Sequence, residues 1–305
     1  MEKRISVSVH NHQNKASGLI AEIRRDERFE YVDFLSYADI LLIDHDATEY
    51  YKRAIMTYKR SGAKVLLYPH GATAHLAWDG VWEPFDMVDG FIAMSYGQAE
   101  TMWRYGYPKP VYVTGWHWCE KKPFTPAQGK EVLFAPIHAL SNGFIHPDIK
   151  ALNGLIHDQL CRMNIGLTVR YIGSLEDCGI ESTHNDVIYT QGRPDNSIDD
   201  IDSADYVVSF GTFAYLAIAR GKPTIMYRQD LPYFDGHSIE NIKEAENWEL
   251  YGDFMRYPID MPHEGDILAQ ANADSLELSE WKDLFIGDQM APGTLGDILL
   301  EVMNV

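Results

Sequence analysis

The sequence predicts an α/β protein of two Rossmann-like domains that face a central cleft. Short, continuously apolar runs alternate with helical segments in both halves of the 305-residue chain, and such runs are typical of parallel strands that are buried on both faces of a sheet. The alternation lapses between Gly115 and Lys130, where Pro123, Pro126 and Gly129 follow no period and indicate a linker. Two similar halves joined by a linker are the signature of this architecture.

The first half alternates strand and helix signals. Right-handed crossovers between parallel strands would give one layer of about six strands. Strands are predicted from the apolar runs at Arg4–Val9, Tyr31–Phe34, Ile40–Ile43, Lys64–Tyr68, Gly90–Met94 and Val111–Thr114. Helices are predicted from their periodicity at Ala16–Glu27, Thr48–Ser61 and Gln98–Tyr105.

The same pattern restarts after the linker. Strands are predicted at Glu131–Ala135, Leu167–Ile172, Val187–Thr190, Tyr206–Phe210 and Thr224–Tyr227. Helices are predicted at Asp148–Asn164, Ile198–Ser203, Phe213–Arg220 and, in the acidic segment that follows, Ile239–Asp253. Apolar residues at helical spacing within 291–305 predict a terminal helix.

The stretch Asp205–Tyr227 reads as a strand, a helix and a second strand. Gly221 ends the helix and Pro223 cannot continue it, so the next strand begins at once. The helix begins at the carboxyl end of the first strand, where free N–H groups and the helix dipole favour an anion. The spacing is neither that of a P-loop nor that of a dinucleotide fingerprint. The residues that would hold a phosphate are Ser209, Gly211 and Thr212.

This "strand, S-x-[ST], helix, GKP, strand" segment resembles the nucleotide-binding half of GT-B glycosyltransferases and their relatives, the CDP-glycerol glycerophosphotransferases and UDP-GlcNAc 2-epimerases. In that superfamily it grips the diphosphate and ribose of the donor, and many members carry a helix Glu where this chain has Tyr215. The resemblance implies an acceptor domain over residues 1–116, a linker over 117–130 and a nucleotide-donor domain over 131–290. It also implies that the terminal helix, 291–305, crosses back to the first domain.

The amino-acid composition limits the classes of partner and the kind of compartment that we expect. The formal net charge is −19, with 45 acidic against 26 basic residues, and no basic run appears, so we expect no nucleic acid partner. This charge also argues against a DNA acceptor, although DNA glucosyltransferases use the same fold. Three scattered cysteines, Cys119, Cys161 and Cys178, indicate reduced thiols and neither a disulfide framework nor a zinc site. Neither a signal peptide nor a membrane-spanning apolar run is found, so we expect a cytoplasmic protein.

The run Tyr68-Pro69-His70-Gly71 ends a predicted strand at the carboxyl edge of the first sheet, where open α/β sheets bind ligands. It resembles the "WHG" segment of glycerophosphotransferases, in which the His is thought to help deprotonate the acceptor. A His with a pKa of about 6.5 suits a general base. The resemblance therefore implies that His70 is catalytic and that Gly71 lies beside the acceptor. The alternative is a His that caps the following turn.

Two more clusters follow strand ends in the first half. His10 and His12 are expected to line the cleft on the acceptor side; they could also bind a metal, but no third ligand is evident. Asp44-His45-Asp46 matches the D-x-D metal motif of GT-A enzymes, yet we interpret it mainly as a helix amino-terminal cap.

Strand ends in the second half supply the predicted donor site. The resemblance places a polar loop, 136–143, over the donor phosphates, and the alternative is an ordinary strand-helix loop. Arg193 is the one nearby cation of its loop and could counter a phosphate charge, or it could be a solvated surface arginine. The predicted donor-binding residues are His138, Ser141, Asn142, Gly173, Ser174, Gln191, Arg193, Ser209, Gly211, Thr212 and Tyr215.

Taken with these signals, the resemblance implies transfer of a sugar from a nucleotide-activated donor to a hydroxyl acceptor. The helix terminus at residues 209–212 would stabilise charge on the departing phosphate. We expect no metal and no cofactor other than the donor itself. Three alternatives stay open: a CDP-glycerol-type phosphotransferase, a nucleotide-sugar 2-epimerase, and a non-catalytic nucleotide-sugar binding protein.

Overall fold

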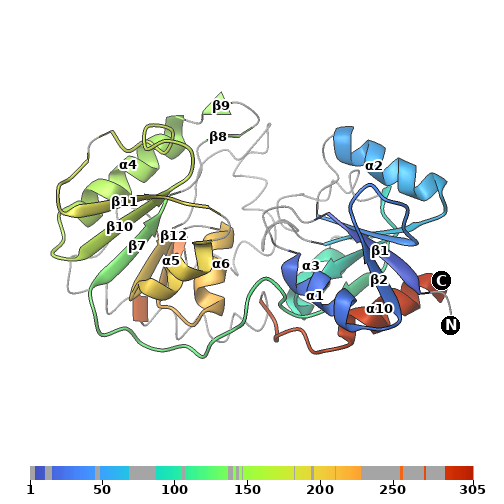
Figure 1. Cartoon of the computed structure of the whole chain (residues 1–305). Coiled ribbons are helices and arrows are strands. Elements are labelled where there is room, and N and C mark those ends of the chain that lie inside the picture. The colour runs from blue at the N-terminus through green and yellow to red at the C-terminus, as the bar shows by residue number, and fades with distance from the viewer. Residues whose placement is uncertain are drawn as a thin grey trace. The chain divides into compact units, whose positions relative to one another are not determined.

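The computed structural model describes the chain in two compact units (Figure 1). Unit 1 comprises Met1–Glu120 and Lys282–Val305, and unit 2 comprises Lys121–Trp281. The residues described are 4–10, 16–44, 49–68, 87–104, 107–136, 140–141, 144–145, 147–181, 183–193, 196–209, 211–227, 255–256, 271–272 and 286–304. The helix predicted at Ile239–Asp253 lies outside them. Among the described residues no helix is long and apolar enough to cross a membrane.

Unit 1 contains a six-stranded, fully parallel sheet in the order β2-β1-β3-β4-β5-β6. Its strands are β1 (Ile5–Val9), β2 (Phe29–Val32), β3 (Ile40–Ile43), β4 (Lys64–Leu67), β5 (Gly90–Ala93) and β6 (Val111–Val113). Its helices are α1 (Ser17–Arg25), α2 (Glu49–Arg60), α3 (Tyr96–Arg104) and α10 (Thr294–Asn304). The predicted strand at Tyr31–Phe34 begins two residues earlier in the structure, because Phe29 already pairs with Ile5 of β1.

Both faces of the unit 1 sheet are covered, as a parallel sheet requires. Successive side chains of a strand point to opposite faces, and β3 shows this clearly. Ile40 and Leu42 belong to the apolar cluster that contains α1 and α10, whereas Leu41 and Ile43 belong to the cluster that contains α2 and α3. The continuous apolar run ILLI is therefore explained by burial on both sides.

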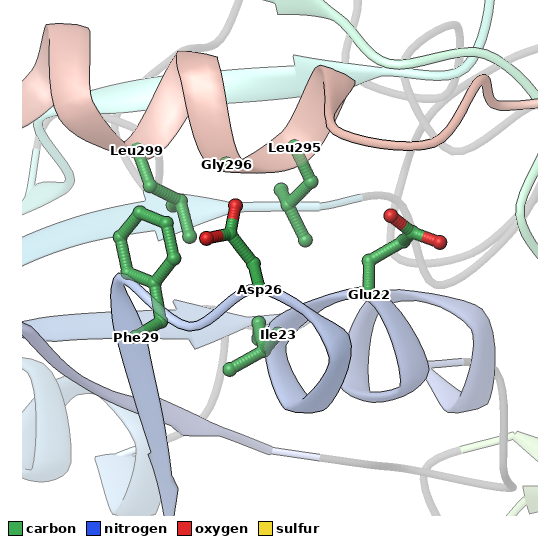
Figure 2. Close-up of a pocket in the computed structure, with 7 residues that line it drawn as sticks. All are labelled: Glu22, Ile23, Asp26, Phe29, Leu295, Gly296 and Leu299. Atoms are coloured by element: carbon green, nitrogen blue, oxygen red, sulfur yellow. The ribbon is translucent and has the colours of Figure 1, made fainter.

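The C-terminal helix α10 packs against α1 in unit 1. Figure 2 shows Leu295 and Leu299 of α10 directed toward α1. The Glu22 carboxylate of α1 accepts a hydrogen bond from the Gly293 N–H at 3.1 Å, which satisfies one of the unpaired donors just before α10. At Gly296 an added Cβ would lie 2.2 Å from Asp26 Oδ2. The two helices therefore touch through a glycine contact and a side-chain cap.

Unit 2 contains a second six-stranded parallel sheet, in the order β11-β10-β7-β12-β13-β14. Its strands are β7 (Glu131–Ala135), β10 (Gly166–Tyr171), β11 (Val187–Gln191), β12 (Tyr206–Ser209), β13 (Thr224–Tyr227) and β14 (Met255–Arg256). A short antiparallel pair joins β8 (Leu140–Ser141) to β9 (Phe144–Ile145). The helices are α4 (Pro147–Cys161), α5 (Ser197–Ser203) and α6 (Gly211–Ala219).

The segment after residue 120 runs along unit 2. The Lys122 N–H donates to the Ala219 carbonyl at 2.8 Å, and the Thr125 N–H donates to the Gly221 carbonyl at 3.1 Å. Gly221 has φ +73°, and a Cβ there would lie 2.1 Å from the Pro123 carbonyl oxygen. Only glycine fits this turn, both for its backbone conformation and for the close approach of the chain beside it.

Candidate functional site

A histidine and an aspartate meet at the carboxyl edge of the unit 1 sheet. His10 follows β1 and Asp44 follows β3, the neighbouring strand. His10 Nδ1 lies 2.5 Å from Asp44 Oδ1. The Asp44 side chain is 1% exposed and the His10 side chain is 16% exposed. The carboxylate is thus held inside the protein while part of the imidazole reaches the surface.

Aromatic residues surround the His10 ring. Phe34 and Tyr51 contact it edge-on, with ring centroids at 4.8 and 4.9 Å, and the Tyr51 hydroxyl lies 3.4 Å from His10 Nε2. The Tyr68 hydroxyl donates to the His10 carbonyl. The second Asp44 oxygen, Oδ2, is buried and has no hydrogen-bond partner among the described residues. Because Asp44 engages Nδ1, Nε2 is the ring nitrogen that can take a proton.

A second buried imidazole, His117, follows β6 in the same unit. Its ring centroid lies 6.3 Å from that of Tyr68, and its Nδ1 lies 3.4 Å from the Gly115 carbonyl oxygen. Burial lowers the pKa of His117 to about 4, and burial also raises the pKa of Tyr68. Neither side chain changes its charge near neutral pH, so His117 stays an uncharged neighbour of Tyr68, whose hydroxyl bonds the His10 carbonyl.

The structure describes only some of the site residues that were predicted in the first half. His12, His70 and Gly71 lie outside the described residues, so their roles stay predictions. Asp44 was interpreted mainly as part of a helix cap; residues 45–48 lie outside the described residues, so that interpretation stays a prediction, and the Asp44 carboxylate lies against His10. Sequence reasoning missed this pairing, although both residues directly follow predicted strands. It also missed His117, which falls in the predicted linker.

In unit 2 the first turn of α6 lies at the carboxyl edge of the sheet, directly after β12. Ser209 ends β12, and its buried hydroxyl donates to the Ala135 carbonyl at 2.9 Å across the neighbouring strand β7. Gly211 is the first residue of α6, and Thr212 is half-buried. Tyr215 is 2% exposed and lies in the core. The amino-terminal end of this nine-residue helix is the part of the edge that favours an anion.

The neighbouring strand ends are joined to each other. The Gln191 side chain, at the end of β11, donates to the Gly173 carbonyl after β10 at 3.2 Å. Ser174 and Asp177 exchange hydrogen bonds: the Asp177 N–H donates to Ser174 Oγ at 3.0 Å, and the Ser174 N–H donates to Asp177 Oδ2 at 3.2 Å. These contacts fix the loops at which the donor was predicted to bind.

Four predicted donor residues remain to be placed. Arg193 is exposed after β11, and its backbone N–H donates to Asn196 Oδ1 at 2.9 Å. Ser141 lies in β8, whose backbone alone is described, and His138 and Asn142 lie outside the described residues.

A buried arginine that the sequence analysis did not single out supports this edge. Arg170 of β10 is 4% exposed. Its Nε donates to Asp200 Oδ2 at 2.8 Å, and its Nη2 donates to the Arg193 carbonyl at 2.6 Å. Its guanidinium lies 4.8 Å from the ring centroid of Phe213 in α6. Arg170 therefore ties the loop after β11 to α5 and to the first turn of α6. An arginine in an otherwise apolar strand was the available signal.

Comparison with solved structures identifies the known fold that this chain resembles. No family model matches the sequence, and no curated protein sequence matches it. Among solved structures, the wall teichoic acid polymerase TagF, soaked with CDPG, matches with a TM-score of 0.53 at 10% identity, over 99% of this chain and 88% of that chain. A UDP-glucosyltransferase from Polygonum tinctorium that glucosylates indoxyl matches with a TM-score of 0.51 at 10% identity, over 100% of both chains.

A third match is a TarM variant from S. aureus, in complex with UDP among other ligands. The TM-score is 0.43 at 9% identity, over 87% of this chain, which spans only 55% of the length of TarM. At such identities the likeness to TagF and to the Polygonum protein shows the fold alone. The chain has two Rossmann-like α/β units, as in the GT-B fold, which confirms the predicted α/β class with two such domains; the cleft between them stays a prediction.

Proposed function

We propose that this protein transfers a sugar from a nucleotide-activated donor to a hydroxyl acceptor, with His10 as the general base and Asp44 as the residue that positions it. The observation that carries the proposal is the His10–Asp44 pair, 2.5 Å apart at the carboxyl edge of unit 1. The GT-B neighbours support the donor class, because one is named as a UDP-glucosyltransferase and another was soaked with CDPG.

The chemistry of the pair suits this reaction. His10 Nε2 takes the proton of the acceptor hydroxyl while the acceptor oxygen bonds to the anomeric carbon of the donor. The bond from that carbon to the phosphate oxygen breaks, and the nucleoside diphosphate leaves with the electron pair. Asp44 holds the tautomer in which Nδ1 carries a proton and stabilises the imidazolium that forms. Since Asp44 is buried, its charge acts with little screening by water.

Groups in unit 2 suit a leaving diphosphate and support the proposal. The first turn of α6 offers N–H groups and the positive end of the helix dipole to negative charge as it develops. The backbone around Gly173 is held by Gln191, and Arg170 fixes the loop that carries Arg193. We propose that the donor binds along this edge and that Arg193 counters one phosphate charge.

His70 is the second candidate base. Its place after β4 and the resemblance of its segment to "WHG" favour it, and comparison of variants distinguishes it from His10. Sugar transfer and phosphoalcohol transfer would use the same base, so the donor panel in the experiment separates these two reactions.

The experiment has two stages. The purified protein is first screened by thermal shift against UDP, GDP, CDP and TDP, their common sugar conjugates, and CDP-glycerol. Nucleotide release from the donor that binds is then measured. We expect His10→Ala to lower kcat by about 100- to 10,000-fold, the usual contribution of general base catalysis, while the donor-induced thermal shift persists.

Matched variants separate the role of His10 from those of Asp44 and His70. Asp44→Asn should lower kcat strongly with little change in donor binding. Asp33→Asn removes an exposed carboxylate from the same sheet edge, after β2, and should leave kcat unchanged. Full turnover by a folded His10→Ala protein would refute His10 as the base, and loss of turnover in His70→Ala alone would assign the role to His70. Donor binding without turnover, or a product formed from the donor alone, would favour the binding-protein and epimerase alternatives respectively.

A further inference from the structure

Two histidines and a cysteine gather in unit 2 where α4 ends and β11 begins. His157 and Cys161 belong to the last turns of α4, and His184 lies three residues before β11. One ligand atom of each lies within 4.8 Å of the others. His157 is buried, Cys161 is half-buried and His184 is exposed. The cluster therefore has a fixed inner side and an outer side that an ion can reach.

The helical pair already has the spacing of two metal ligands. Residues four apart lie on one face of a helix, and Cys161 Sγ lies 3.4 Å from His157 Nε2. A tetrahedral zinc ion, with Zn–S of about 2.3 Å and Zn–N of about 2.0–2.1 Å, holds sulfur and nitrogen about 3.6 Å apart. The helix thus presents this pair within a few tenths of an ångström of the required separation, and the exposed His184 ring is the ligand that must move inward.

The orientation of the His157 ring also suits a ligand. Nδ1 faces the Asp158 carboxylate, with Oδ1 at 3.6 Å, while Nε2 faces Cys161. In metal sites the ring nitrogen that does not bind the ion commonly points to a carboxylate, which fixes the ring and makes the ligand more basic. Asp158 and Asp186 both act electrostatically on Cys161. Two carboxylates beside the Cys161 thiol favour a divalent cation at this position.

Tyr189 is the present partner of His157 Nε2. Its hydroxyl lies 3.0 Å from that nitrogen, and it accepts a hydrogen bond from the His184 N–H at 3.1 Å. The Tyr189 hydroxyl therefore contacts Nε2, the nitrogen that would bind an ion. If the cluster were only a hydrogen-bonded support, the Tyr189 hydroxyl would be essential to the cluster. If the cluster binds a metal, the Tyr189 hydroxyl competes with the ion for His157 Nε2.

We propose that His157, Cys161 and His184 bind one Zn²⁺ ion, with a water molecule in the fourth position. Imidazole and thiolate ligands together favour zinc over magnesium or calcium, which prefer oxygen. Cys161 binds as the thiolate, and its proton passes to solvent. The sequence analysis expected no zinc site because the chain has no C-x-x-C pair; the third ligand, His184, is separated from the helical pair by all of β10.

The site differs from the proposed donor site. The donor residues follow the carboxyl ends of β10 and β11, whereas His184 and Cys161 lie before the amino ends of these strands. The five residues of β11 span about 16 Å between the two edges. The ion would join the end of α4 to the start of β11, so it would stabilise unit 2 and take no part in transfer.

The test titrates the metal-free, full-length protein with Zn²⁺ and, separately, with Co²⁺. We expect one equivalent of Zn²⁺ to bind by calorimetry, and Co²⁺ to give a thiolate-to-cobalt charge-transfer band. Cys161→Ser should abolish this band. Cys161→Ser and His184→Ala should each weaken Zn²⁺ binding by more than about 100-fold, because even carboxylates behind the ligands commonly contribute 10- to 100-fold. Mg²⁺ should not bind at this cluster.

Three further variants separate a metal site from a hydrogen-bonded cluster. Cys119→Ser changes a cysteine of unit 1 and should leave both the affinity and the cobalt band unchanged. Asp158→Asn, at a 54% exposed side chain, should weaken binding by about 10-fold. Tyr189→Phe should bind Zn²⁺ at least as tightly as the wild type. Absence of stoichiometric Zn²⁺ binding, or binding that survives both Cys161→Ser and His184→Ala, would overturn the proposal.

Discussion

Acid should destabilise unit 1 through one buried histidine, His117. The residue is 3% exposed, and its Nε2 has no hydrogen-bond partner among the described residues. Burial lowers the pKa of His117 to about 4, whereas an unfolded chain holds a histidine with a pKa of about 6.5. Between these values the unfolded state binds more protons than the folded state. Stability must therefore fall as the pH falls from 6.5 toward 4.

The size of the effect follows from the two pKa values. Near pH 7.5 the imidazole is neutral in both states and contributes almost nothing to the pH dependence. At about pH 5 the difference in protonation removes roughly 2 kcal/mol from the free energy of unfolding, and near pH 4 it removes roughly 3 kcal/mol. Losses of this size are a large fraction of the free energy of unfolding of an ordinary domain.

The assay is urea unfolding of the wild type and of His117→Gln at about pH 7.5 and about pH 5. Burial also lowers the pKa of His157 in unit 2, so the wild type alone would mix two histidines. The variant keeps His157, and the difference between the two proteins isolates His117. We expect the pH-dependent loss to be smaller in His117→Gln by roughly 2 kcal/mol, whatever its stability at neutral pH. Equal losses in both proteins would show that His117 is not held neutral by burial.

Three substitutions test contacts within each unit, with stability measured by urea unfolding. Gly221→Ala should lower the free energy of unfolding by clearly more than Gly62→Ala. Both glycines have positive φ, which costs an alanine about 1–2 kcal/mol, but only at Gly221 would the added Cβ meet backbone, at Pro123. Equal losses of stability in the two variants would contradict this contact. Arg170→Lys should destabilise unit 2 by about 2–3 kcal/mol, since a lysine cannot replace several charge-assisted hydrogen bonds of a buried guanidinium, and a neutral result would deny its supporting role. Glu22→Gln should loosen α10 by about 1 kcal/mol and speed amide exchange over Thr294–Asn304; unchanged exchange would show that the cap does not hold the helix.

Much of the fold could be predicted because its signals are local. An apolar run such as Ile40–Ile43 reports burial on both faces, and the structure gives the same bounds. Gly221 and Pro223 mark the end of α6 and the start of β13 because their backbone restrictions act on their own residues. The register of β2 and the short β8–β9 pair could not be predicted, since both depend on a partner strand.

The sites were predictable only in part. Strand ends are visible in the sequence, so His10, Gln191 and the start of α6 were found as edge residues. Which ends are neighbours depends on the strand order, and that order places His10 beside Asp44, 34 residues away in the chain. The role of Arg170 depends on the path of the loop after β11, which no local pattern specifies.

The sequence by itself determined the α/β class, the two halves with buried parallel strands, and the strand ends that carry the candidate site residues. These follow from periodicity and from the backbone limits of glycine and proline, which act within a few residues. Only the tertiary structure decided that Asp44 lies against His10, that His117 is buried, and that His184 meets the His157–Cys161 pair. Those facts require side chains from distant segments to share one position, and burial then changes the charge that each can carry.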